Sequence, residues 1–214
     1  QNGINLDILT SKSLNFKKKY DINSDFILFL GRFSKIKGLD ILLESINVLK
    51  DKIDSSKIKF VIMGVDFGFE SEMLDMIMKF KLENMIKVIK NPPREDVIQA
   101  YRESKFLVYP SRWELSPLTP LEAFAFKKTI ISTTAHGIPH TIQHDQNCIL
   151  VEPDNPNLLS ESILELMNDE KKCERLGISG NQMVIDTCNS EKMVKNTLTT
   201  YEQLIKEKSK SGMI

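Results

Sequence analysis

The chain has 214 residues, of which 41% are hydrophobic and 27% charged, so it can bury a sizeable core without disulfides or structural metals. Its 29 basic residues balance its 29 acidic residues, which argues against bulk affinity for nucleic acid and makes any anion recognition local. The three cysteines are too few and too far apart for a disulfide framework or a zinc site, and no apolar run approaches the roughly 20 residues that span a bilayer.

Short apolar runs alternate with amphipathic patterns from residue 26 onward, after a polar lead-in over residues 1–25. Continuous apolar strands that alternate with helices indicate one α/β domain over residues 26–208, with a doubly wound, Rossmann-like parallel sheet. A short tail follows over residues 209–214. The runs predict strands at 26–30, 58–63, 86–89, 106–109, 129–132 and 149–151. The amphipathic patterns predict helices near 38–50, 70–81, 94–103, 118–126, 156–168, 171–186 and 190–208.

The turn after the first predicted strand carries three cations, Arg32, Lys35 and Lys37, within the segment Gly31–Gly38. It lies between the carboxyl end of a strand and the start of a helix, where free N–H groups favour an anion. Arg32 can bind phosphate oxygens bidentately and Lys37 adds a point charge. This arrangement predicts a diphosphate clamp, although its spacing is not that of a Walker loop. The alternative is a set of solvated cations.

Two glutamates, Glu114 and Glu122, lie seven intervening residues apart. Pro117 and Pro120 favour a helix that starts near Leu118, which places Glu114 in the loop and Glu122 in the first turns of the helix. Paired carboxylates occur in glycosidases, but a pair in one loop–helix turn favours hydrogen bonds to sugar and ribose hydroxyls. The alternative is a solvated Glu114 and a Glu122 that complements the helix dipole.

Four segments, GRFSKIKG, VIMGVDFG, VYPSRWELSPLTPLEAFAF and GIPHTIQHDQNCILVEPDNP, follow one another along the chain. Together they resemble the carboxyl-terminal half of a retaining glycosyltransferase of family 4, an enzyme of GT-B fold with two facing Rossmann-like domains. The resemblance covers nearly the whole chain. Residues 1–4 resemble the interdomain segment before that half, so we expect residues 1–25 to be an interdomain lead-in. The first residue, Gln1, is not a methionine, which suggests a piece of a longer protein.

The resemblance implies a role for each matching residue. Arg32 and Lys37 match positions that hold the donor diphosphate, and Glu114 matches the glutamate that contacts the donor sugar, so these three are the predicted catalytic residues. The other matching positions are predicted to bind the donor: Gly31 and Gly64 beside the nucleotide, Lys90 and Asn91 at the base, the N–H groups of Leu118 and Thr119 at the sugar and distal phosphate, and Glu122 at the ribose hydroxyls.

The chain departs from the family pattern at two places. Lys127 stands where a glycine usually ends the helix after Glu122. A non-glycine residue in a left-handed cap costs about 1 kcal/mol, so the helix either bears this cost or ends in a different cap. His136 and His140 replace a glycine and the glutamate of the usual GGIPE segment. The second departure leaves the identity of the donor sugar open.

Three histidines, His136, His140 and His144, recur every four residues, a spacing that would align metal ligands on a helix. Gly137 and Pro139 break such a helix, so we expect no metal site. We also expect no cofactor. The resemblance implies that the substrate is a UDP- or GDP-linked nucleotide-diphosphate sugar.

The sequence therefore predicts the donor-binding domain of a transferase that moves a hexose, with retention, to a saccharide or lipid-linked acceptor. The resemblance puts the acceptor site on an amino-terminal domain outside this chain, so we expect the chain alone to bind donor but to transfer little. Two alternatives are a catalytically inactive nucleotide-binding or interaction module and a GT-B enzyme of the sucrose-phosphate or glycogen synthase type. We expect a cytoplasmic protein with no nucleic acid partner, and peripheral membrane association of the full-length enzyme stays open.

Overall fold

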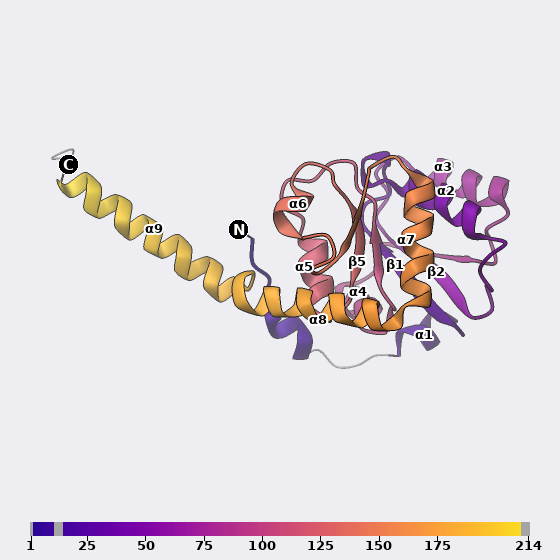
Figure 1. The fold of residues 1–214 in the computed structure, drawn as a ribbon, viewed down its shortest axis with the longest axis horizontal. Coiled ribbons are helices and arrows are strands. Elements are labelled where there is room, and N and C mark those ends of the chain that lie inside the picture. Colours follow the sequence, from indigo (N-terminus) through magenta and orange to yellow (C-terminus); the bar gives the residue numbers. More distant parts are fainter. Residues whose placement is uncertain (1, 11–14, 211–214) are drawn as a thin grey trace.

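Six parallel strands form one sheet with the order β3-β2-β1-β4-β5-β6, and helices pack around this sheet (Figure 1). The structure is a computed structural model that describes residues 2–10 and 15–210. Its strands are β1 Asp25–Leu30, β2 Ile58–Gly64, β3 Ile86–Lys90, β4 Leu107–Tyr109, β5 Ile130–Thr133 and β6 Ile149–Val151. The predicted parallel α/β fold is confirmed, and each predicted strand lies within one residue of its observed bounds.

Helices cover both faces of this sheet. The seven predicted helices are present as α2 Leu39–Leu49, α3 Glu70–Phe80, α4 Arg94–Glu103, α5 Leu118–Ala125, α7 Pro156–Asn168, α8 Glu170–Thr187 and α9 Ser190–Lys210. The described residues also form four short helices that were not predicted: η1 Leu6–Thr10, α1 Phe16–Lys19, η2 Lys35–Lys37 and α6 Ile138–Thr141. A segment of about one turn is too short to display a helical period, which explains why the sequence did not indicate them.

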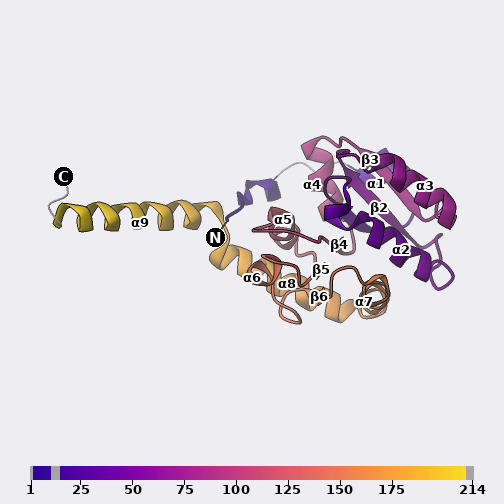
Figure 2. The same ribbon diagram turned by 90° about the horizontal axis from the view of Figure 1, so that it is seen from above.

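Helices lie on both sides of the sheet (Figure 2), and the core consists of two apolar layers, one on each face. Along β1, Phe26 and Leu28 pack with α1, α4, α5 and α6, whereas Ile27 and Phe29 pack with α2, α3 and α7. Successive side chains of a strand point to opposite faces of the sheet. All four are at most 1% exposed, so the uninterrupted apolar run is what a strand covered on both faces requires.

The order of the strands reverses direction between β1 and β4, which pair at Leu28 and Leu107. From β1 the chain adds β2 and β3 outward on one side, and it then returns to add β4, β5 and β6 on the other. The loops that follow β1 and β4 therefore leave neighbouring strands at the same edge of the sheet. Ligands of doubly wound sheets bind at this kind of crevice.

The first 25 residues are more closely packed than a polar lead-in suggests. Phe16 and Ile22 are at most 2% exposed and Ile4 is 6% exposed, and all three belong to the apolar layer that contains α4. The Glu103 carboxylate on α4 accepts a hydrogen bond from the Phe16 N–H at 2.9 Å. The described part of this segment is therefore packed on the domain, and its interdomain role stays a prediction.

Helix α5 ends with a lysine in the left-handed conformation. Lys127 has a φ of 57°, and the Lys128 N–H donates to the Ala123 carbonyl oxygen at 3.0 Å. This hydrogen bond closes the helix end in the manner that usually requires glycine. Of the two alternatives that the sequence left open, the structure therefore has the strained, non-glycine cap.

Helix α9 extends away from the sheet and its covering helices (Figures 1 and 2). Ser209 and Lys210 belong to it, so the predicted tail begins inside a helix, and residues 211–214 lie outside the described residues. Among the described residues, no helix combines the length and the apolar character needed to cross a membrane.

Candidate functional site

Two glycines allow backbone segments to meet at the carboxyl edge of the sheet. A Cβ atom on Gly64, at the end of β2, would lie 1.8 Å from the Gly31 carbonyl oxygen. Gly38, which precedes α2, has a φ of +67°, and a Cβ there would lie 1.9 Å from the Pro110 carbonyl oxygen. A side chain at residue 38 would therefore push apart the loops that follow β1 and β4.

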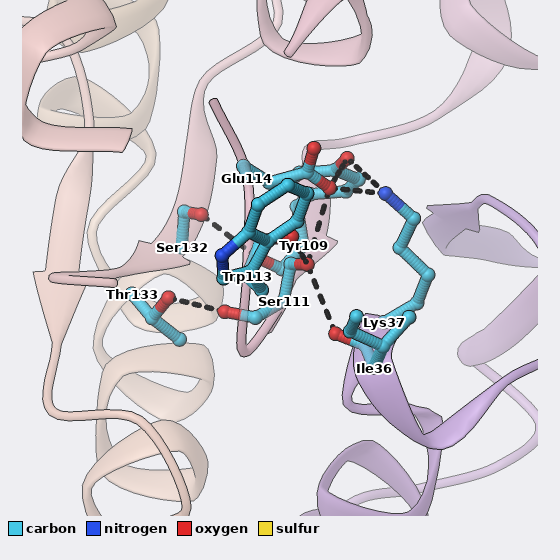
Figure 3. Close-up of polar contacts among 8 residues, drawn as sticks. All are labelled: Ile36, Lys37, Tyr109, Ser111, Trp113, Glu114, Ser132 and Thr133. Atoms are coloured by element: carbon cyan, nitrogen blue, oxygen red, sulfur yellow. Dashed lines mark hydrogen bonds and ion pairs between the residues drawn. The ribbon is translucent and has the colours of Figure 1, made fainter. Parts of the chain in front are cut away.

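This close packing brings Lys37 against Glu114, although the two residues are far apart in the sequence (Figure 3). Lys37 Nζ forms an ion pair with Glu114 Oε1 and donates to the Tyr109 hydroxyl oxygen at 3.3 Å. The Tyr109 hydroxyl and Ser111 Oγ also donate to Glu114 Oε1, the latter at 3.1 Å. The Lys37 and Glu114 side chains are only 11% and 12% exposed, so the alternatives of a solvated Lys37 and a solvated Glu114 are wrong.

The hydroxyl groups of Tyr109 and Ser111 support the ion pair through Glu114 Oε1. Burial, together with the nearby Glu114 carboxylate, raises the pKa of Tyr109, so its hydroxyl stays protonated and donates. Ser132 Oγ donates to the Tyr109 carbonyl oxygen at 2.7 Å, and Thr133 Oγ1 donates to the Ser111 carbonyl oxygen at 2.6 Å. Strand β5 therefore holds the loop that carries the glutamate, and a buried charge needs this kind of support.

Arg32 lies on the same loop as Lys37 but has different surroundings. It is exposed, and its guanidinium carbon lies 4.7 Å from the centroid of the Phe67 ring, a cation–π distance. The Phe33 N–H donates to the Val65 carbonyl oxygen at 2.8 Å, which ties the loop after β1 to the loop after β2. The two predicted clamp cations are thus held separately, Arg32 at the surface and Lys37 in the buried ion pair.

Glu122 faces α4 from the second turn of α5. Its Oε1 accepts from Arg94 Nη2 at 2.5 Å and its Oε2 accepts from the Tyr101 hydroxyl at 2.9 Å. The Glu122 side chain is 17% exposed and the Arg94 side chain 48%. The Glu122 hydrogen bond is the main cause of a raised Arg94 pKa, and burial is the main cause of a raised Tyr101 pKa. Sequence reasoning missed both partners, because nothing in their spacing predicts that α4 meets α5 at this point.

The other predicted donor-binding positions also follow strands of this sheet edge or begin α5. The Asn91 N–H donates to the Gly64 carbonyl oxygen at 2.8 Å, and Asn91 itself has a φ of 48°. Lys90 forms a 2.7 Å ion pair with Glu70. Helix α5 starts at Leu118, and the N–H groups of its first turn have no partner within the helix, as in any α-helix. No side chain caps them either, because the residue before the helix is Pro117.

The three regularly spaced histidines do not share one helix. Only His140 lies in α6, while His136 precedes it and His144 follows it, and all three are exposed. Pro139 is the second residue of α6, where a missing N–H costs no hydrogen bond. In the part of the chain that the structure describes, no three histidine, cysteine, aspartate or glutamate side chains gather as metal ligands would. The metal-free prediction itself is not tested by this.

The strand order, the reversal between β1 and β4 and the helices on both faces define a Rossmann-like α/β domain of the kind found in GT-B glycosyltransferases. The family described as Glycosyl transferases group 1 matches residues 11–183. The chain therefore belongs to the group 1 glycosyltransferase family. An uncharacterized glycosyltransferase from Methanocaldococcus jannaschii is 32% identical over 210 residues, which cover 95% of this chain and 52% of that protein.

Solved structures share the fold at lower identity. The Anabaena protein HepE, solved in complex with UDP-glucose, has a TM-score of 0.82 at 18% identity, over 94% of this chain and 56% of that one. The C-terminal domain of LpcC, a glycosyl transferase group 1 family protein from Francisella tularensis, has a TM-score of 0.74 at 22% identity, over 88% of this chain and 100% of that one. The chain spans about half the length of the HepE chain and about half the length of the Methanocaldococcus relative.

Proposed function

We propose that this chain is the donor-binding, carboxyl-terminal domain of a retaining hexosyltransferase of family 4, which uses a UDP- or GDP-linked sugar. The observation that carries the proposal is the buried contact between Lys37 and Glu114 at the edge where the strand order reverses. Two further findings support it. The solved HepE complex holds UDP-glucose on the same fold, and the LpcC C-terminal domain is matched over its whole length.

In this proposal, the cations and the start of α5 bind the donor diphosphate. Arg32 is exposed and can reach a ligand, and the first N–H groups of α5, those of Leu118 and Thr119, lack intrahelical partners. As the bond between sugar and phosphate breaks, negative charge grows on the distal phosphate oxygens. Donors that are already oriented toward that charge lower the barrier, and removing one typically costs a few kcal/mol in the transition state.

The two glutamates bind hydroxyl groups at the two ends of the donor in this proposal. The three described contacts of the Glu114 carboxylate converge on Oε1, so we assign Oε2 to a hydroxyl of the donor sugar. Arg94 and Tyr101 each take one oxygen of Glu122 and fix its orientation. Each carboxylate oxygen has two lone pairs, so Glu122 retains acceptor capacity for the ribose hydroxyls.

The acceptor site belongs, in the same proposal, to another domain of a longer protein. The chain matches 52% of the Methanocaldococcus relative and 56% of the HepE chain, which leaves length in both proteins for a second domain. We therefore expect this chain to bind donor nucleotide while transferring little sugar. The proposal also includes a saccharide or lipid-linked acceptor, a cytoplasmic location and peripheral membrane association of the full-length enzyme.

Calorimetric titration of the chain with UDP, GDP and ADP, with magnesium and with EDTA, tests the proposal. We expect one nucleotide to bind without metal and to lose at least tenfold in affinity with Arg32→Ala or Glu122→Ala. Arg175→Ala is the matched control, because Arg175 is exposed on α8 and belongs to no predicted site. Equal binding by wild type and both site variants would refute the assigned site. An inactive binding module would instead bind nucleotide normally while the full-length protein transferred no sugar.

A further inference from the structure

Arg112 makes a set of contacts that the predicted donor site does not explain. It stands two residues before Glu114, and its side chain is 26% exposed. Its Nη1 and Nη2 atoms lie 2.7 and 2.9 Å from the two carboxylate oxygens of Asp40, and Nε lies 2.6 Å from Asp154 Oδ1. Nη1 also donates to the Lys35 carbonyl oxygen. The guanidinium group therefore contacts three separate segments of the chain.

Two of those segments flank Lys37. Lys35 begins η2, which Lys37 ends, and Asp40 lies in the first turn of α2. The backbone strengthens the connection, because the Arg112 N–H donates to the Ile36 carbonyl oxygen at 2.8 Å. The turn that carries Lys37 is thus held on both sides by the residue that precedes the glutamate loop.

We propose that Arg112 is a positioning residue that sets Lys37 against Glu114 for binding of the donor diphosphate. This inference rests on the proposed function. Arg112 does not itself contact the ion pair in the structure, and it acts by fixing η2 against the loop after β4. The planar guanidinium group can bind Asp40 with two nitrogens while a third nitrogen binds Asp154. A lysine at this position would keep the charge and lose that geometry.

The two acidic partners of Arg112 differ in burial, so one can be substituted as the test, Asp40, and the other as the control, Asp154. The Asp40 side chain is 17% exposed and accepts both terminal nitrogens, whereas the Asp154 side chain is 59% exposed and accepts one nitrogen. Solvent screens the outer pair, so its loss has little effect on the position of the guanidinium group. Asp40→Asn is therefore expected to move the turn that carries Lys37, and Asp154→Asn is the matched control.

The test compares how much the distal phosphate contributes to binding in each protein. We measure the dissociation constants of UMP and UDP, and of GMP and GDP, for wild type, Arg112→Lys, Asp40→Asn and Asp154→Asn. The dissociation constant of the monophosphate divided by that of the diphosphate reports how much the distal phosphate adds to binding. A change in overall stability does not alter this ratio as long as the protein is folded. Circular dichroism and thermal melting identify the temperature range in which each variant is folded. Asp40→Asn serves if Arg112→Lys does not fold.

We expect Arg112→Lys and Asp40→Asn to reduce this ratio about tenfold, with monophosphate affinity unchanged, and Asp154→Asn to stay within about twofold. A ratio preserved in both Arg112→Lys and Asp40→Asn would overturn the positioning role while the donor site stands. An equal loss of affinity for monophosphate and diphosphate would do the same. If wild type binds neither UDP nor GDP, the proposed function fails and this inference fails with it.

Discussion

Lys37 and Glu114 form a nearly buried ion pair between η2 and the loop after β4, although 77 positions separate them in the sequence. The pair occupies the place where the strand order reverses, and the hydroxyl groups of Tyr109 and Ser111 also donate to the Oε1 atom of Glu114. The structure thus joins a predicted phosphate ligand to a predicted sugar ligand. Their contact has consequences for stability as well as for binding.

Removing both members of the pair is expected to destabilise the fold by less than the sum of the two single removals. Lys37→Met leaves a buried carboxylate without its cation, and Glu114→Gln leaves a buried ammonium group without its anion. Each change is expected to cost about 3 kcal/mol of unfolding free energy. The double variant should cost clearly less than the sum of the two. Urea unfolding of the four proteins measures the coupling energy, and additive costs would show that the two charges do not stabilise each other.

The ribose role assigned to Glu122 can be separated from a general effect on the site. Glu122→Gln is expected to weaken binding of the preferred nucleoside diphosphate about tenfold, since a hydrogen bond to a charged group is worth about 1.5–3 kcal/mol. The same variant should lose much less affinity for the 2′-deoxy form of that nucleotide. Glu202→Gln on α9 is the control. Equal losses for the ribose and deoxyribose nucleotides would contradict the assignment.

Gly38 is expected to tolerate no side chain, because a Cβ would meet the Pro110 carbonyl oxygen in addition to the strain of its positive φ. Gly68 shares a positive φ of +86° but has nothing within 4 Å of its Cβ position. Gly68→Ala should therefore cost about 1–2 kcal/mol, the strain alone, and Gly38→Ala clearly more. Chemical denaturation measures both values. Similar costs at the two positions would mean that the loops after β1 and β4 are not packed as described.

Stability is expected to fall at alkaline pH because folding keeps Tyr109 protonated. Burial is the main cause of its raised pKa, and the Glu114 carboxylate adds to it. Above the ordinary tyrosine pKa of about 10, the unfolded chain releases this proton while the folded chain holds it, so unfolding becomes easier as pH rises. The contribution reaches about 1.4 kcal/mol per pH unit for one group.

Tyr109→Phe removes this titration and provides the comparison. Between pH 9 and 11.5, the unfolding free energy of wild type should decline more steeply than that of the variant, as measured by urea denaturation at each pH. Parallel declines for the two proteins would show that the Tyr109 hydroxyl ionises in the folded state as it does in the unfolded chain.

The sequence was sufficient to predict the sheet because local patterns determine it. Short apolar runs such as Phe26–Leu30 were correctly interpreted as buried parallel strands. The turn after β1 and the loop after β4 were also expected at the functional edge, since the carboxyl ends of parallel strands share one side. These predictions need only neighbouring residues and general rules of sheet topology.

The partners of the site residues required the structure. No spacing rule shows that Lys37 reaches Glu114, that Arg94 reaches Glu122, or that Arg112 reaches Asp40, because each contact joins segments far apart in sequence. Short elements such as α6 were not predicted for a related reason. A single turn has no period, and its stability comes from packing that the sequence does not display.

The most direct measurement is a crystal structure of this chain with the nucleoside diphosphate that it binds. We expect the diphosphate beside Arg32 and the first N–H groups of α5, with the ribose hydroxyls at Glu122 and the base near Asn91. A nucleotide bound at the opposite end of the strands, for example beside Lys105 and Lys128, would contradict the proposed donor site.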